Sequence, residues 1–141
     1  MDYSELAVKL LNNMRSLSKI KSHKNISEAL HGEAFVLDYI SRQNGDVLPG
    51  KIGQEMNVST ARIATALNSL ENKGLITRQI DKNDRRKILI DLTQEGKDLA
   101  ERHRQTIIKV AANMLELLGE HDANEYVRIS GKLAEMLPKL Q

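Results

Sequence analysis

The stretch that decides the fold spans residues 59–92 and reads STARIATALNSLENKGLITRQIDKNDRRKILIDL. Ser59 suits a helix N-cap, because its hydroxyl can accept a hydrogen bond from a first-turn N–H group. Apolar residues then recur at i, i+4 and i+7, the spacing of one helix face, and these are Ile63, Leu67 and Leu70. Lys73-Gly74 suits a helix end, since glycine tolerates the left-handed conformation found there. The pattern predicts an amphipathic helix between Ser59 and Gly74.

The opposite face of this helix is small and polar. It carries Ala61, Arg62, Thr65, Asn68, Ser69 and Asn72. Such a face fits the DNA major groove, where Arg pairs with guanine, Asn pairs with adenine, and Thr or Ala methyls contact thymine. For an isolated helix, a solvated surface is the simpler interpretation. The flanking sequence favours the DNA-binding interpretation.

A shorter helix is predicted upstream, over Pro49 to Asn57, because proline is tolerated in a first helical turn. Asn57-Val58 would then link the two helices in a helix-turn-helix. Gly53 lies one turn before the link, where a missing side chain would let the second helix cross closely.

A β-hairpin is predicted downstream of Gly74. Ile76 and Ile80 alternate with Thr77 and Gln79, as expected of a half-buried strand. Ile88, Ile90 and Leu92 alternate with Leu89 and Asp91 and predict the second strand. The segment between them, Asp81 to Lys87, is rich in turn formers and cations.

These motifs resemble the MarR family of winged helix-turn-helix transcription regulators. The resemblance rests on LNSLENKGLI at 67–76, on Asp81 and Asp84-Arg85-Arg86, and on LTQEG at 92–96, and it extends over essentially all 141 residues. It implies a mainly α fold with a small β-wing. It also implies a homodimer whose recognition helices enter successive major grooves of double-stranded DNA while the wing tips reach the flanking minor grooves.

The resemblance also assigns roles within the wing. Arg86 matches the family's wing-tip arginine, which enters the minor groove, and Asp84 matches the acid that braces it; as an alternative or additional role, Asp84 is a turn former. Arg85 corresponds to a phosphate contact, although a solvated turn charge is the simpler interpretation of any single cation. The complete set of expected DNA-binding residues is Lys51, Ser59, Thr60, Ala61, Arg62, Thr65, Asn68, Arg78, Lys82, Asp84, Arg85 and Arg86.

The termini supply further amphipathic helices. We expect helices over residues 3–22, over 94–118 with Thr93 as N-cap, and from Asp122 to just before Pro138. Their apolar positions exceed what one small lobe can cover, so pairing with a second copy is expected. The chain is thus one domain, 1–141, with a dimerisation region in 1–24 and 94–141 and a winged lobe in 29–93.

A core helix is expected over residues 29–43, capped by Gly45. In the family, the junction of the two lobes often binds a small anionic or lipophilic effector. The candidate lining residues are Arg15, His31, Phe35 and Tyr39. Ordinary core packing and surface charge are the alternative for each.

Several classes of protein fit the sequence poorly. The chain has no cysteine, which excludes disulfides, thiolate metal sites and thiol redox sensing. The histidines form no metal-binding motif, and an apparent helix break separates His23 from His31, so neither a metal nor another cofactor is expected. Phosphate-binding loops and nucleophile motifs are missing, which argues against an enzyme. Without a signal peptide or a membrane span, a cytoplasmic protein is expected.

The sequence therefore predicts a DNA-binding transcriptional regulator. A repressor that binds a pseudo-palindromic operator as a homodimer, and is released by a small effector, fits best. The alternative is a winged-helix protein-interaction module that has lost DNA binding, because a fold does not fix a function.

Overall fold

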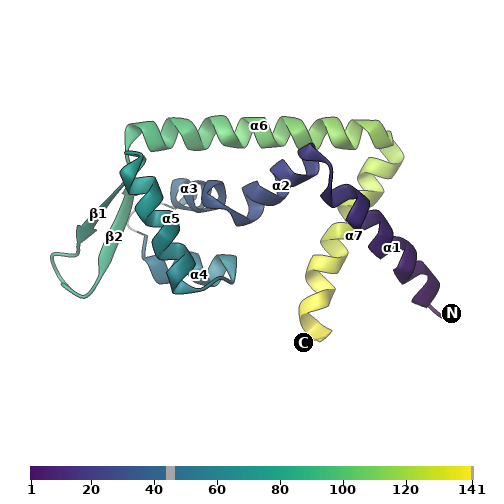
Figure 1. Cartoon of the computed structure of the whole chain (residues 1–141), viewed down its shortest axis with the longest axis horizontal. Coiled ribbons are helices and arrows are strands. Elements are labelled where there is room, and N and C mark those ends of the chain that lie inside the picture. Colours follow the sequence, from purple (N-terminus) through teal and green to yellow (C-terminus); the bar gives the residue numbers. More distant parts are fainter. Residues whose placement is uncertain (44–46, 141) are drawn as a thin grey trace. The chain divides into compact units, whose positions relative to one another are not determined.

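The computed structural model describes residues 1–43 and 47–140, and these form helices and one small β-hairpin (Figure 1). The elements in chain order are α1 (Ser4–Ser18), α2 (Lys21–His31), α3 (Glu33–Arg42), α4 (Pro49–Met56), α5 (Thr60–Asn72), β1 (Ile76–Ile80), β2 (Ile88–Leu92), α6 (Gln94–Leu118), α7 (Glu120–Met136) and the 3₁₀ helix η1 (Leu137–Leu140). The mainly α class with a small β-wing is confirmed.

Both ends of α5 lie where the sequence predicts them. The Ser59 hydroxyl accepts a hydrogen bond from the backbone N–H of Arg62 at 3.3 Å. At the other end Gly74 has a φ of 75°, and the N–H of Leu75 donates to the carbonyl of Leu70 at 3.0 Å. This is the 6→1 hydrogen bond of a Schellman motif, which satisfies a terminal carbonyl and fixes the direction of the chain into the wing.

The predicted apolar stripe of α5 is the centre of the core. Ile63, Leu67 and Leu70 are each 2% exposed. They belong to one buried cluster with residues of α3, α4 and the wing, namely Val36, Leu37, Ile40, Ile52, Ile76 and Ile90. Full burial of one such side chain stabilises by about 1.5–3 kcal/mol, whereas one hydrogen bond contributes a net ~0.5–1.5 kcal/mol. Apolar packing is therefore the main force that holds α5 in place.

The link between α4 and α5 is tight, as predicted. Asn57 is left-handed with a φ of 53°, and the N–H of Val58 donates to the carbonyl of Gly53 at 3.2 Å. A Cβ on Gly53 would lie 3.6 Å from a side-chain carbon of Ile63, which is ordinary van der Waals contact. The expected need for glycine at position 53 is therefore wrong, because a methyl group fits.

The wing pairs in antiparallel register, with Ile76 opposite Leu92 and Ile80 opposite Ile88. Val47 makes an additional bridge to Ile90. The strands are buried only near Ile76 and Ile90, at the end of the hairpin that joins the core. At the far end, Ile80 is 64% and Ile88 is 44% exposed, so the expected half-buried pattern is wrong there, because the hairpin extends beyond the elements that could cover it.

Thr93 caps α6 and ties it to the end of α5. Its hydroxyl accepts a hydrogen bond from the N–H of Gly96 at 3.0 Å and donates to the carbonyl of Gly74 at 2.7 Å. Gly96 is buried against the backbone of Leu75, where an added Cβ would overlap the carbonyl oxygen. The first turn of α6 therefore packs directly on the chain between α5 and β1.

The N-terminal third differs from the prediction. Instead of helices over 3–22 and 29–43, there are three helices, and the segment between His23 and His31 is helical rather than broken. The break occurs at Gly32, which is extended between α2 and α3. A Cβ on Gly32 would lie 2.9 Å from the carbonyl oxygen of Glu28, so only glycine fits this junction. The expected cap at Gly45 lies outside the described residues.

The chain divides into two compact units, Met1–Ile107 and Ile108–Gln141. In the second unit, α7 begins at Glu120 rather than at the predicted Asp122. Gly119, with a φ of 81°, makes the turn after α6 and serves as the N-cap without a side-chain hydrogen bond. Glycine thus sets the helix start two residues before the capping box expected from the sequence.

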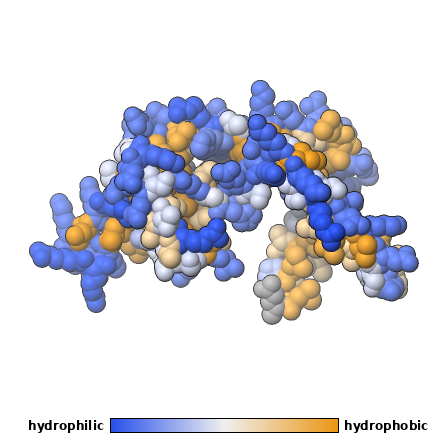
Figure 2. Space-filling model, viewed as in Figure 1, coloured by the Kyte–Doolittle hydropathy of each residue, from blue (hydrophilic) through white to orange (hydrophobic). Residues whose placement is uncertain are grey.

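Large apolar side chains remain exposed on the terminal helices. Within their described residues, α1, α2 and α7 have no buried position. Figure 2 shows hydrophobic side chains at the surface of α7. The exposed set on α1 and α7 includes Leu6, Leu10, Met14, Tyr126, Ile129, Leu133 and Met136.

Over residues 1–43 and 47–140, none of the helices combines the length and the apolar character that crossing a membrane requires.

We predict that Gly96→Ala lowers the free energy of unfolding by about 2 kcal/mol or more, because the new methyl group meets backbone that cannot move freely. Urea unfolding followed by circular dichroism would measure this change.

Gly50→Ala is the matched control, since Gly50 is a helical residue of α4 and a methyl group added to it would meet no atom within 4 Å. It should leave stability unchanged or raise it by up to ~1 kcal/mol. If both variants lowered the free energy of unfolding equally, the contact at Gly96 would not be tight.

Candidate nucleic-acid interface

The exposed side of α5 carries the predicted base-reading residues. Ala61, Thr65 and Asn68 are exposed and follow one another at i, i+4 and i+7, on the face opposite the buried stripe. The Thr65 hydroxyl donates to the carbonyl of Ala61 at 3.0 Å. The Thr65 proton is therefore used within the helix, and Asn68 is the neutral hydrogen-bond donor of this stripe.

The remaining predicted contacts surround this stripe. Exposed positions are Lys51, Ser59, Thr60, Arg62, Lys82, Arg85 and Arg86, and half-buried positions are Arg78 and Asp84. Their contacts with DNA stay predictions. Ser69, which the helical pattern placed on the same polar face, instead donates to Glu33 of α3 at 3.0 Å, and Lys73 binds the same carboxylate oxygen at 2.9 Å.

Arg78 joins the wing to α5 through an arrangement that the sequence did not reveal. Its Nε donates to Glu71 at 3.2 Å, and its Nη2 donates both to the other Glu71 oxygen at 2.8 Å and to Asn68 Oδ1 at 2.7 Å. The hydrogen bond from Arg78 holds the pKa of Glu71 below its ordinary range. Strand alternation would have placed Arg78 on the face of Ile76, toward α5, and this was the overlooked signal.

The wing tip is held by an ordered turn. The N–H of Asp81 donates to the carbonyl of Lys87 at 3.0 Å, and the N–H of Asn83 donates to the Asp81 carboxylate at 2.9 Å. These local bonds close the hairpin and place residues 84–86 at its end.

Asp84 and Arg86 lie together at this tip, as predicted. Asp84 Oδ1 accepts from the backbone N–H of Arg86 at 3.1 Å and from its Nε at 3.2 Å. The Arg86 side chain is nevertheless 90% exposed, against 28% for Asp84. Hydrogen bonding to Arg86 lowers the pKa of Asp84 below its ordinary value. Arg86 Nη2 also donates to Asp84 Oδ2 at 3.5 Å, so Asp84 holds one edge of the guanidinium while the side chain as a whole stays exposed.

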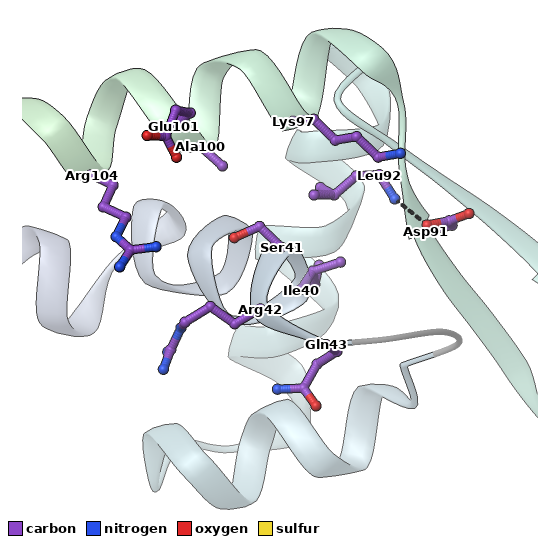
Figure 3. A pocket seen from close by; sticks show the side chains of 10 residues that line it. All are labelled: Ile40, Ser41, Arg42, Gln43, Asp91, Leu92, Lys97, Ala100, Glu101 and Arg104. Carbon is purple, nitrogen blue, oxygen red and sulfur yellow. Dashed lines mark hydrogen bonds between the residues drawn. The ribbon is translucent and has the colours of Figure 1, made fainter.

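A cavity of about 620 Å³ opens between the end of α3, the end of β2 and the start of α6 (Figure 3). In the view of Figure 3, the side chains of Arg42 and Arg104 lie at one end, and those of Lys97 and Asp91 lie at the other. None of the four effector candidates lines this cavity.

The effector candidates lie elsewhere in the first unit. The rings of Phe35 and Tyr39 stack at 6.4 Å on α3, whereas Arg15 on α1 donates to Asn12. His31 borders two other hollows, of about 310 and 390 Å³, and Arg62 borders both as well. The structure therefore brings Phe35 and Tyr39 together, and the shared pocket of all four stays a prediction.

Within the described residues, no three histidine or acidic side chains come together as a group that could hold a metal ion.

Comparison with known proteins gives consistent matches. The family model described as MarR family matches residues 30–87. The HTH-type transcriptional regulator YwhA of Bacillus subtilis (strain 168) is 32% identical over 142 residues, covering 96% of this chain and 100% of that protein. The HTH-type transcriptional repressor YetL of the same strain is 24% identical over 135 residues, covering 94% of this chain and 81% of that protein.

The fold also matches solved structures. The crystal structure of Streptococcus pneumoniae FabT in complex with DNA aligns with a TM-score of 0.73 at 22% identity, covering 99% of this chain and all of that one. At this identity the likeness is one of fold.

We predict that Glu71 and Asp84 titrate below their ordinary pKa values of 4.5 and 3.8, each because of its own arginine. Since both pKa values are lower in the folded state, this stabilisation is present above the ordinary values and is lost as pH falls through the folded-state pKa. NMR titration of the side-chain carboxyl carbons would measure both groups.

The two arginines serve as controls for each other. Arg78→Lys should raise the pKa of Glu71 and leave that of Asp84 unchanged, and Arg86→Ala should do the reverse. If either variant moved both pKa values equally, the two ion pairs would not be independent.

Proposed function

The chain belongs to the MarR family of helix-turn-helix transcriptional regulators, and on that premise we propose that it is a homodimeric repressor of a pseudo-palindromic DNA operator. As a member of this family it is a DNA-binding transcriptional regulator. The observation that carries the more specific proposal is the wing tip, where Asp84 orients the exposed Arg86.

The homodimer is supported by the uncovered terminal helices. Leucines, isoleucines and methionines follow α1 and α7 at helical spacing, and they are about half exposed in the single chain. Burial of such side chains contributes about 1.5–3 kcal/mol each, so a second copy that covers these faces gains considerable stability. A symmetric pair presents the same surface twice, which matches a pseudo-palindromic operator.

In the proposed complex, each α5 enters a major groove with Ala61, Thr65 and Asn68 toward the bases. Two such helices on one face of the duplex read half-sites about one helical turn apart, roughly 34–36 Å. Arg62 and the cations of the wing, Lys82 and Arg85, contact bases or phosphates near this groove.

The wing extends the contact into the flanking minor groove. A narrow, A·T-rich minor groove has an enhanced negative potential, and a guanidinium loses its hydration there more readily than an ammonium. Arg86 has this chemistry, and its exposure leaves it free to enter. The ion pair with Asp84 reduces the rotamer freedom that Arg86 loses on binding.

Repression is the proposed outcome of binding, supported by the similarity to YetL, which is named a repressor. A small anionic or lipophilic effector is the proposed release signal. The half-buried, stacked rings of Phe35 and Tyr39 support an apolar contact for such a ligand.

We predict that Arg86→Ala weakens binding to the operator by at least about tenfold and reduces the slope of log K against log salt by about 1 per wing. Fluorescence anisotropy on duplexes selected by the wild type from a randomised library, at two salt concentrations, would measure this.

Arg42→Ala is the control, because Arg42 is a surface arginine of α3 paired with Asp38 rather than a wing residue. It should leave affinity and salt slope unchanged. Undiminished binding by Arg86→Ala would remove the wing from the mechanism, and a wild type that selects no sequence would refute operator binding itself.

We also predict that Leu133→Glu raises the dimer dissociation constant at least about a hundredfold. Each copy loses a buried leucine worth at least ~1.5 kcal/mol, and symmetry counts the loss twice. Sedimentation equilibrium would measure the change.

Gly131→Glu adds the same carboxylate two residues away on α7, on the opposite side of the helix, where an added Cβ meets no atom within 4 Å, and it should remain dimeric. Equal dissociation of both variants would point to charge rather than to the apolar face, and a dimer that survives Leu133→Glu would place the interface elsewhere.

A further inference from the structure

The side chain of Asn68 is held by a hydrogen bond from Arg78 of β1. Arg78 Nη2 contacts one of its amide atoms at 2.7 Å. A guanidinium has donors only, so the contacted atom must be the oxygen, Oδ1. The amide nitrogen, with its two hydrogens, therefore lies on the side of the amide that points away from Arg78.

The arginine that holds Asn68 is itself fixed. Glu71 binds Nε and Nη2 of Arg78 with both carboxylate oxygens, which is the bidentate fork that makes arginine–carboxylate pairs strong and directional. Arg78 is half-buried. A reversal of the Asn68 amide would place an N–H₂ group against this guanidinium, donor against donor.

The geometry points to Arg78 as a specificity-determining residue that orients Asn68 to present a hydrogen-bond donor to the DNA bases. This inference rests on the proposed binding of α5 in the major groove. Asparagine normally reads adenine with both amide atoms, since the oxygen accepts from N6 and the nitrogen donates to N7. Here the oxygen is engaged by Arg78.

The consequence is a change in the base that Asn68 favours. Guanine offers two acceptors in the major groove, and thymine offers one, whereas cytosine presents a donor and adenine sets its N6 donor beside a single acceptor, N7. Arg78 occupies one lone pair of Asn68 Oδ1 and holds the oxygen on its own side. Asn68 therefore presents its N–H₂ group and favours guanine or thymine over adenine, whose N6 donor would lack an acceptor. The hydroxyl of Thr65 does not compete for the same acceptor, because its proton is bound to Ala61.

Selection from a randomised duplex library, followed by sequencing, tests this with the wild type, Asn68→Ala and Arg78→Lys. The position read by Asn68 is the one whose base preference disappears in Asn68→Ala. At that position the wild type should favour guanine or thymine over adenine by at least about fivefold, the lower end of what one good side-chain–base pair discriminates. Lysine keeps the charge beside Glu71 but lacks the fork, so Arg78→Lys should release the amide and reduce this ratio at least about threefold.

Arg128→Lys is the matched control. Arg128 makes the same kind of fork with Glu125, through Nε and Nη2, but it lies on α7. The Arg128→Lys variant should select the same DNA motif as the wild type.

The outcomes are distinct. A wild-type motif with adenine at the Asn68 position would overturn this inference and leave the proposed function intact. A change in Arg78→Lys that weakens all sequences equally would also overturn it, because that is the effect of a purely structural residue. If Arg78→Lys does not fold, the wild type and Asn68→Ala decide the question alone. A wild type that selects no motif would overturn both proposals.

Discussion

Burial of one face of α5 is the constraint on which the rest of the structure depends. Ile63, Leu67 and Leu70 pack against α3, α4 and the base of the wing at the same time. Because these three residues lie on one side of the helix, the opposite side must face outward. The surface proposed to meet DNA is thus defined by which residues of α5 the core buries.

Polar contacts then fix the rotation and the direction of the helix that the core has positioned. Glu33 binds Ser69 and Lys73 on one flank, and Arg78 binds Glu71 on the other. Each exposed ion pair contributes little energy, about 0–1 kcal/mol. Their importance is geometric, since they join α3, α5 and β1 at defined points.

The sequence predicted those parts of the fold that local chemistry determines. The caps at Ser59 and Gly74, the periodic stripe of α5 and the turn from Asp81 to Lys87 each carry their own signal. The helix α2 carries a weak signal, because it is mostly polar and has no buried residue. Its junction with α3 depends on a close backbone approach at Gly32. Strand alternation places Arg78 on the face of Ile76, but which residues of α5 it binds depends on how the hairpin lies against that helix, and no local pattern contains this. Strand alternation likewise indicates which face a residue occupies, but it does not indicate whether anything covers that face, as at Ile80.

The link from α5 to the wing has a consequence for regulation. The left-handed turn at Gly74 and the fork between Glu71 and Arg78 connect the recognition helix to β1 at two points. In the proposed complex, the major-groove helix and the minor-groove wing of one chain therefore form one rigid unit with a fixed spacing between them. The proposed release signal has little to adjust inside this unit. In the proposed dimer, the remaining variable is the separation and tilt of two such units, so the proposed control acts through the match between their spacing and the pitch of the duplex.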